Sequence, residues 1–120
     1  MAFEIIKKDG IIYLRGLKGN RLIQKESDVI TLMSKCSEKK ADRMLLYKDN
    51  LPEGFTSLGT GLAGMVLDKF MAYKMKLAVV VDETDMNKGK FSELASEVNA
   101  HNNLFHVFTD PAEAEKWLVK

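Results

Sequence analysis

The sequence predicts a single α/β domain over residues 1–120, built on one mixed, mostly parallel five-stranded sheet. Strand-like and helix-like segments alternate along most of the chain, and this alternation favours a parallel sheet with right-handed crossovers. The run Leu77–Val81 (LAVVV) is apolar without interruption, as expected of a strand covered on both faces. We therefore expect the order β-β-α-β-α-β-α-β-α, with helices above and below the sheet.

The amino-terminal segment predicts an antiparallel hairpin. Residues 2–7 and 11–14 are rich in strand-forming side chains, and Asp9-Gly10 lies between them. An Asp-Gly pair between two such runs is a strong hairpin signal. We expect the hairpin to form an antiparallel edge of the sheet, followed by a loop over residues 16–24. The exposed edge of this hairpin is also a possible site of homodimer formation.

Four segments have the apolar spacing of helices. The first covers residues 26–40, the second begins near Thr60, and the third covers about residues 88–99. The fourth follows Asp110-Pro111-Ala112-Glu113, a capping box with proline at the first helical position. The positions expected to face the core are, in order, Val29, Ile30, Leu32, Met33 and Cys36; Leu62, Val66, Phe70 and Tyr73; Phe91, Leu94, Ala95 and Val98; Ala114, Trp117 and Leu118.

Two further strands and the single cysteine complete the predicted fold. Residues 43–47 (RMLLY) and 104–108 (LFHVF) are the remaining strand-like runs. One cysteine excludes an internal disulfide. Cys36 lies on the apolar face of the first helix, so we expect a small buried hydrophobic side chain rather than a reactive thiol.

Composition and charge exclude several functional classes. Eighteen basic and seventeen acidic side chains give a net charge of +1, which argues against a strongly basic nucleic-acid-binding protein. The longest apolar runs fall far short of the roughly 20 residues that a membrane span requires. The first ten residues (MAFEIIKKDG) lack a signal-peptide pattern because charged residues interrupt the apolar ones. We expect a cytoplasmic protein with no membrane and no nucleic-acid partner.

Three glycines gather at the start of the second helix. Gly59, Gly61 and Gly64 fall where each costs roughly 1 kcal/mol of helix stability relative to alanine. One interpretation is structural: the helix approaches the sheet closely and a tight turn leads into it. The other is functional: exposed N–H groups at the helix start receive an anion. The segment contains neither the lysine of a P-loop nor a GxGxxG motif.

Most of the chain from Ala41 onward resembles a known family. The runs ADRMLLYKDNL, FTSLGTGLAG, LDKFMAYKMKLAVVVD and FHVFTDPAEAEKWL resemble the bacterial family filed as domain of unknown function 4180. The most specific part is TGLAG followed by the KF…Y-x-x-KLA-V strand. This resemblance implies a shared fold, and it carries no assigned activity.

A second, more distant resemblance is to STAS-type domains, which include sulfate-transporter domains and anti-sigma-factor antagonists of sporulation. They share this order of elements, and their regulatory loop precedes a helix that opens with serine-glycine-leucine. Thr60-Gly61-Leu62 is similar to that helix start. The serine that is phosphorylated in STAS domains corresponds to Gly59 here, and the neighbouring hydroxyl groups belong to Ser57 and Thr60.

Polar side chains follow the predicted parallel strands. In open α/β sheets, ligands bind outside the carboxyl ends of the strands. That edge should collect Asp49 and Asn50, then Asp82, Glu83 and Asp85, and finally Thr109 and Asp110. Asp49, Asp82 and Asp85 are candidate ligands of a hard cation such as Mg²⁺. Polar residues are also the usual composition of such loops, so we predict no cofactor and no catalytic residue.

Three hypotheses about function follow. The preferred one is a non-enzymatic STAS-like regulatory or interaction module that presents the Thr56–Gly64 loop and the following helix to a protein partner. The second is a domain that binds a small anionic ligand at the Thr60/Gly61 helix start, where the helix dipole contributes about 0.3–1 kcal/mol. The third is a Mg²⁺-dependent phosphate enzyme that uses the aspartates at the carboxyl ends. The candidate residues for partner or ligand binding are Ser57, Gly59, Thr60, Gly61 and Gly64.

Overall fold

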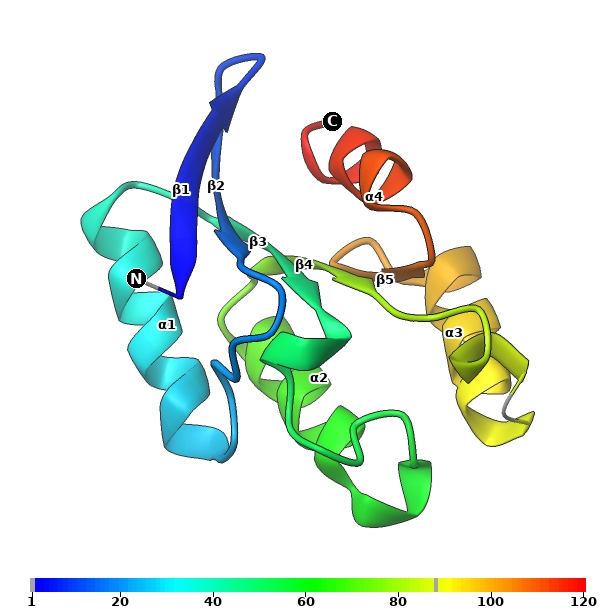
Figure 1. Ribbon diagram of the computed structural model, residues 1–120. Helices are drawn as coiled ribbons and strands as arrows, with labels where there is room; N and C mark the ends of the chain where they lie inside the picture. Colours follow the sequence, from blue (N-terminus) through cyan, green and yellow to red (C-terminus); the bar gives the residue numbers. More distant parts are fainter. Residues whose placement is uncertain (1, 88) are drawn as a thin grey trace.

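One five-stranded mixed sheet forms the centre of the molecule (Figure 1). The structure is a computed structural model that describes residues 2–87 and 89–120, apart from the side chain of Leu58. The strands are β1 (Phe3–Lys8), β2 (Ile11–Gly16), β3 (Arg43–Tyr47), β4 (Lys76–Val80) and β5 (Phe105–Phe108). They lie side by side in the order β1-β2-β3-β4-β5. Only β1 and β2 are antiparallel, and every other neighbouring pair is parallel. The α/β class and the single mixed sheet are as predicted.

The amino-terminal hairpin supplies the antiparallel edge that the Asp-Gly pair predicts. Lys8 lies opposite Ile11, so Asp9 and Gly10 form a two-residue turn. Their φ angles are 53° and 80°, the combination that a type I′ turn requires. Such a turn matches the right-handed twist of the two strands, and the hairpin rises beyond the body of the sheet in Figure 1.

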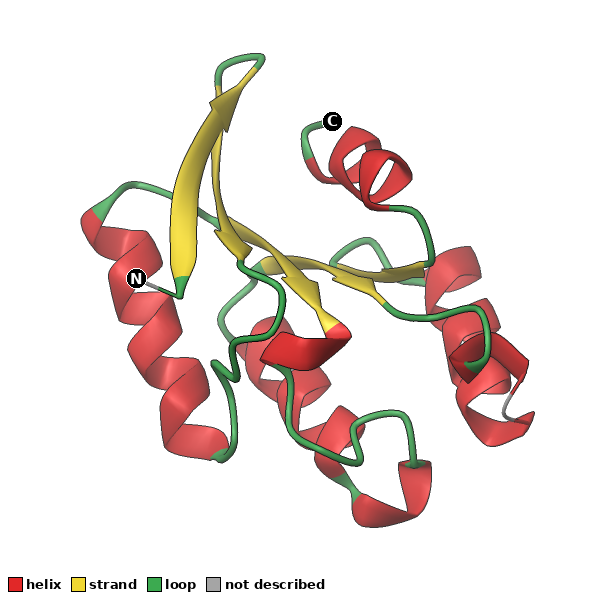
Figure 2. Cartoon of the chain, in the orientation of Figure 1, coloured by secondary structure: helices red, strands yellow, loops and turns green. Residues whose placement is uncertain are grey.

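The helices cover the two faces of the sheet unequally. The chain forms α1 (Glu26–Glu38), α2 (Leu62–Ala72), α3 (Gly89–His101) and α4 (Pro111–Leu118), with short 3₁₀ turns η1 (Lys48–Asn50), η2 (Leu58–Thr60) and η3 (Asp85–Asn87). Figures 1 and 2 show α1, α2 and α3 beneath the sheet and α4 above it. Successive right-handed crossovers between β2 and β5 place their helices on one face, so only the last helix can cover the other.

The apolar run in β4 is buried on both sides, as its composition predicts. Leu77 and Val79 belong to the larger core, which lies between the sheet and α1, α2 and α3. Ala78 and Val80 face the opposite way and pack with α4 residues such as Leu118. Because β4 pairs with β3 on one side and β5 on the other, it has no solvent-facing edge.

Several predicted positions differ in detail. The first helix ends at Glu38 rather than residue 40, because Lys40 adopts a φ of 60° outside the helical region. Tyr73 was expected to face inward, but it is 56% exposed because α2 ends before it. Ile30 lies at the margin of the apolar face of α1 and is 36% exposed. The predicted start of the third helix at residue 88 lies outside the described residues.

Cys36 behaves as the sequence predicts. Its side chain is fully buried in the larger core. Burial and, to a smaller extent, the charge of Asp42 raise the pKa of the thiol to about 12. The thiolate form that reacts with electrophiles is therefore strongly disfavoured at neutral pH.

Short helix α4 is held at both ends by side chains. At its start, the Asp110 carboxylate accepts a hydrogen bond from the Ala112 N–H, as the capping pattern predicts. At its end, Arg43 donates to the carbonyl oxygens of Leu118 and Lys120. Lys76 donates to the Trp117 carbonyl and lies 4.4 Å from the centroid of that indole ring. Two cations at the carboxyl end complement the dipole of the helix.

The helices of the described residues do not have the combination of length and apolar character that a membrane crossing needs.

Candidate functional site

Four adjoining hollows lie along the carboxyl edge of the parallel strands. Their volumes are about 320, 120, 370 and 300 Å³. Neighbouring hollows share lining residues: the first two share Lys48 and Asp49, and Arg21 lines every hollow except the first. Together they form one depression, here named the carboxyl-edge furrow, which runs from Leu62 at the start of α2 to Thr109 and Pro111 before α4. Ligands of open α/β sheets bind at this edge.

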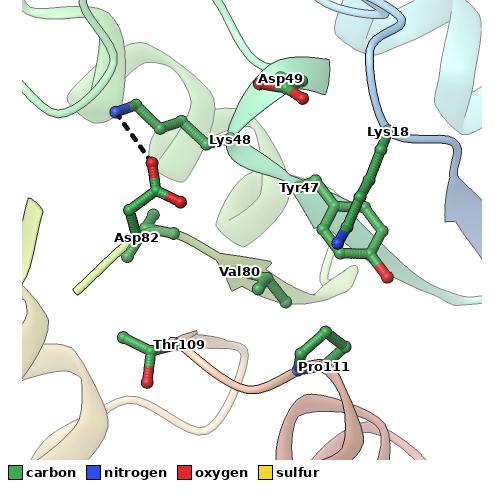
Figure 3. Close-up of a pocket in the computed structure, with 9 residues that line it drawn as sticks. Lys18, Tyr47, Lys48, Asp49, Val80, Asp82, Thr109 and Pro111 are labelled. Atoms are coloured by element: carbon green, nitrogen blue, oxygen red, sulfur yellow. Dashed lines mark ion pairs between the residues drawn. The ribbon is translucent and has the colours of Figure 1, made fainter. Parts of the chain in front are cut away.

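The hollow next to α4 has a mixed charged and aromatic lining (Figure 3). Tyr47, at the end of β3, lies beneath the ammonium group of Lys18, which is 5.1 Å from the ring centroid. Thr109 and Pro111 form the opposite wall, and Val80 lies between. Lys18 comes from the loop after β2, and the connections after β3, β4 and β5 supply Asp49, Asp82 and Thr109, so four connections meet around this hollow.

A lysine and a buried carboxylate stabilise the floor of the furrow. The Lys48 ammonium donates to the Asp85 carboxylate over 2.9 Å, and Asp85 is fully buried. The other Asp85 oxygen accepts the backbone N–H of Asp82 over 3.1 Å. The hydrogen bond and charge of Asp85 raise the pKa of Lys48, and Asp82, 3.8 Å away, adds to this. The pair ties the end of β3 to the loop after β4.

The three aspartates predicted as candidate metal ligands serve different local contacts. Asp85 bonds Lys48, whereas Asp49 accepts a hydrogen bond from the Gly19 N–H over 3.1 Å. Asp82 is 75% exposed and points toward Lys48. Within residues 2–87 and 89–120, no group of three or more histidine, cysteine or acidic side chains is arranged to hold a metal ion. The geometry therefore gives the magnesium hypothesis no support.

Asn50, counted with the polar side chains at this edge, has a structural role. It is fully buried, and its amide donates to the carbonyl oxygens of Leu17 and Asn20. Its side-chain oxygen accepts the Tyr47 N–H over 2.7 Å. Gly16 permits this arrangement, because a Cβ atom there would lie 2.2 Å from the Asn50 Oδ1 atom. The loop that carries Lys18 is thereby fixed against the end of β3.

The Thr56–Gly64 loop lies beside the far end of the furrow and is ordered by its own hydrogen bonds. The Thr60 hydroxyl lies 2.9 Å from the Ser57 carbonyl oxygen and 3.1 Å from that of Gly54. The same hydroxyl accepts the N–H of Leu62, the first residue of α2. One donor at the helix start is therefore already used. This weakens the expectation of an anion at Thr60/Gly61.

The glycines of this loop correct the structural interpretation of the sequence. A Cβ atom on Gly59, Gly61 or Gly64 would meet no atom within 4 Å, so close packing of helix on sheet does not explain them. A tight turn does explain Gly61, whose φ is 75°. Gly59 and Gly64 have neither a positive φ nor a close neighbour, and both are exposed. With exposed Ser57 and Thr60, they give this end of the furrow a surface of backbone and small side chains.

Comparison with known proteins places the chain in a family. A family model described as "Domain of unknown function (DUF4180)" matches residues 8–118, from the hairpin turn to the end of α4. The chain belongs to the DUF4180 family. Searches of curated proteins and of solved structures found no match.

Sequence reasoning about this DUF4180 member missed three cations of the furrow, Lys18, Arg21 and Lys48. Lys48 carries a signal, since it directly follows a predicted strand and so lies at the edge where ligands bind. The sequence around Lys18 carries no such signal, because a lysine between glycines is common in any solvent-exposed loop. Contacts of the loop after β2 with Asn50 and Asp49, which are distant in sequence, hold Lys18 over Tyr47.

Proposed function

We propose that this protein is a non-enzymatic regulatory module of the STAS-like kind that binds a segment of a partner protein in the carboxyl-edge furrow. The Thr56–Gly64 loop forms one end of the binding surface. The observation that carries this proposal is the exposure of Gly59 and Gly64. A residue that breaks a local preference without a gain in packing marks a position where function outweighs stability. At these two positions, an absent side chain allows a partner to approach the backbone closely.

The shape and charge of the furrow fit an extended protein segment better than a compact substrate. The hollows are shallow neighbours rather than one deep cavity, and they follow one another along the sheet edge. Lys18, Arg21 and Lys48 alternate with Asp49, Glu53 and Asp82 around them. Mixed charges of this kind contribute more to the orientation and selection of a protein partner than to the strength of binding.

The proposed module differs from a phosphorylation-switched STAS domain at the decisive position. Gly59 stands where those domains carry their phosphorylated serine, and glycine has no hydroxyl group to modify. Thr60, the next hydroxyl in the loop, already bonds the loop and the helix start. We therefore propose that binding here is controlled by the presence of the partner, not by phosphate at that position.

The test uses a substitution that adds bulk and charge without disturbing the fold. Gly64→Glu places a side chain into open space on α2, and Ala100→Glu, which introduces the same side chain at an exposed position of α3, is the control. Circular dichroism and thermal unfolding first establish that all three proteins are folded. Each is then used as bait in a native lysate, and the captured proteins are identified by mass spectrometry and tested again in purified form.

We expect wild type and Ala100→Glu to retain a common partner that Gly64→Glu loses. Loss of at least tenfold in affinity for the purified partner, about 1.4 kcal/mol, supports the proposal. Identical capture by all three baits contradicts it. Gly61→Asp is less informative than Gly64→Glu, because the φ of 75° at Gly61 makes any side chain there a source of backbone strain.

A second candidate function is binding of a small anion. The volume and lining of the hollow beside Lys18 favour that hollow over the helix start as the binding site. That hollow has a volume of about 320 Å³, within the range of small-ligand pockets. Lys18 and Thr109 supply a cation and a hydroxyl group at its rim. Isothermal titration with phosphate and with small carboxylates tests this idea. Binding that disappears in Lys18→Met but persists in Gly64→Glu would favour it over the protein-partner proposal.

A further inference from the structure

Two helices are followed by lysines in a backbone conformation that suits glycine. Lys40 follows α1 with a φ of 60°, and Lys74 follows α2 with a φ of 55°. In both places the N–H of the next residue, Ala41 or Met75, bonds back to a carbonyl oxygen in the last turn of the helix. This is the Schellman arrangement, in which glycine is the usual residue at the left-handed position because a Cβ atom there is strained.

Attraction to the carboxyl end of the helix dipole does not account for these two lysines. A lysine inside the last helical turn gains the same attraction without a left-handed φ, and Lys35 of α1 and Lys69 of α2 already lie there. At an exposed position, the strain of a left-handed side chain exceeds what the dipole returns. Lysine at both positions therefore breaks a local preference without a gain in stability, which is expected where a side chain serves function.

Both lysines lie at the amino ends of the parallel strands, the edge opposite the furrow. One precedes β3 and the other precedes β4, and these strands are neighbours in the sheet. Figure 1 shows α1 and α2 ending at the side where β3 and β4 begin. The two connections, residues 38–43 and 73–76, are here named the amino-edge face. They form one surface, because the N–H of Lys76 donates to the Asp42 carbonyl oxygen over 3.2 Å.

The amino-edge face concentrates positive charge that the net charge of the chain conceals. It contains two carboxylates and five cations: Glu38 and Asp42; Lys39, Lys40, Arg43, Lys74 and Lys76. The whole chain has a net charge of +1, so the rest of it is net negative. Asp42 pairs with Arg43 over 3.1 Å. Lys39, Lys40 and Lys74 are exposed, and within the described part of the chain none of them forms an ion pair.

Two exposed apolar side chains adjoin these lysines. Tyr73, directly before Lys74, is 56% exposed, and Met71 is 45% exposed. The Met71 sulfur lies 3.6 Å from the Asn102 amide nitrogen, and the Asn102 side-chain oxygen accepts the N–H of Phe105, the first residue of β5. Met71 therefore lies at the same edge of the sheet. A phenol ring and a thioether beside unpaired lysines give this edge an amphipathic surface.

We propose that the amino-edge face binds the surface of a membrane that contains anionic lipids. Its unpaired cations are lysines, which are compact point charges, whereas the Arg43 guanidinium is bonded to Asp42 and to carbonyl oxygens at the end of α4. Such charges fit the diffuse negative potential of a lipid surface better than one defined phosphate group. Tyr73 and Met71 fit the boundary between headgroups and acyl chains. Stacking of nucleotide bases would account for Tyr73 and leave Met71 unexplained.

Membrane attachment at this face leaves the carboxyl-edge furrow accessible, because the furrow lies at the opposite ends of the same strands. Attachment does not require the partner function proposed above, and each can be tested without the other. Net charge did not reveal this face, since it averages over both edges. The expectation of no membrane partner, which came from composition, therefore gives way to this proposal.

Replacing the two left-handed lysines by glycine separates membrane binding from stability. Lys40→Gly/Lys74→Gly removes two charges together with the backbone strain, so the double variant should unfold at a higher temperature than wild type. Lys25→Gln/Lys90→Gln removes two exposed charges near the opposite edge and is the matched control. Sedimentation with phosphatidylcholine vesicles, with and without about 30% phosphatidylserine, measures binding by each folded protein.

We expect wild type and the control to bind the phosphatidylserine vesicles about tenfold more tightly than the neutral ones, and less tightly as salt is raised. The glycine variant should lose about tenfold in affinity while being the more stable protein. Tyr73→Ser, which keeps every charge, should also bind these vesicles more weakly. A wild type that binds neither vesicle overturns the proposal, and so does equal binding by the glycine variant.

A fluorescent single-stranded oligonucleotide provides the competing polyanion. Wild type should bind it more weakly than the phosphatidylserine vesicles, and Tyr73→Ser and Met71→Ser should both weaken vesicle binding. Tighter binding of the oligonucleotide, lost in Lys40→Gly/Lys74→Gly, would make the amino-edge face a nucleic-acid surface and overturn the proposal.

Discussion

Two glycines illustrate how the same residue type serves different purposes at the residue scale. Gly16 is buried, and its missing side chain makes room for Asn50. Gly64 is exposed in α2, and nothing in the described structure occupies the space that its side chain would fill. Composition alone does not distinguish these positions, because the difference depends on what lies across from each Cα atom.

Substitution of each glycine by alanine should therefore have opposite effects on stability. Gly64→Ala should raise the free energy of unfolding by about 1 kcal/mol, because alanine is the better helix former and meets no obstacle. Gly16→Ala should lower it by about 3 kcal/mol, because Asn50 must move and give up buried hydrogen bonds. Urea unfolding of both variants checks the pair. A destabilised Gly64→Ala would mean that α2 packs more tightly than the structure indicates.

At the scale of elements, the connections between strands and helices carry the functional surface. The loop after β2 is held by Asn50, and the loop after β4 is held by Asp85. Both anchors belong to or contact η1, the short turn after β3. The floor of the furrow is therefore rigid, because buried polar groups with satisfied hydrogen bonds have one favourable arrangement. A rigid floor suits the proposed role of the furrow, because a preordered surface loses less conformational entropy when a partner binds.

Removing the cation of this anchor should destabilise the protein. Lys48→Met removes the ammonium group of Lys48 from the buried Asp85 carboxylate and should cost about 2 kcal/mol. This value lies below the cost at a fully buried pair because the Lys48 side chain is 39% exposed. Asp82→Asn is the matched control, since it removes a more distant and 75% exposed partner, and should cost less than about 0.5 kcal/mol. Chemical denaturation distinguishes these outcomes. Equal losses of unfolding free energy in the two variants would show that the Lys48–Asp85 pair does not anchor the loop after β4.

At the scale of the whole molecule, one carboxylate links the two ends of the chain. Glu115 of α4 accepts a hydrogen bond from the buried Tyr13 hydroxyl and another from Lys8 at the hairpin turn. Hydrogen bonds from Lys8 and then from Tyr13 lower the pKa of Glu115. Burial raises the pKa of Tyr13, and its bond to Glu115 raises it further. The last helix is thereby fastened to the antiparallel edge of the sheet.

This link should give stability a defined acid dependence. The pKa of Glu115 is lower in the folded chain than its ordinary value of 4.5, so the folded state favours the carboxylate. The stabilisation is complete above pH 4.5 and disappears as the pH falls below 4.5 through the folded-state pKa. Glu115→Gln should be less stable at neutral pH and should lose less stability on acidification. Denaturation curves at several pH values test this; parallel losses for both proteins would assign the acid dependence to other groups.

The sequence alone determined the strands, the hairpin and the single mixed sheet. Asp9-Gly10 forms its turn because of local φ preferences. The apolar run of β4 indicates burial on both faces of the sheet, whichever elements cover it. The DUF4180 resemblance also followed from local motifs, and the family match over residues 8–118 agrees with it.

Only the tertiary structure decided which side chains meet. Lys18 reaches Tyr47, and Lys48 reaches Asp85, across 29 and 37 positions of sequence. No local pattern encodes such contacts, because they depend on how neighbouring strands align and how each loop is anchored. The same applies to the open space around Gly59 and Gly64, for which the sequence left close packing and a functional role as alternatives. Local preference fixes what each segment becomes, and the placement of segments fixes the surface that they present together.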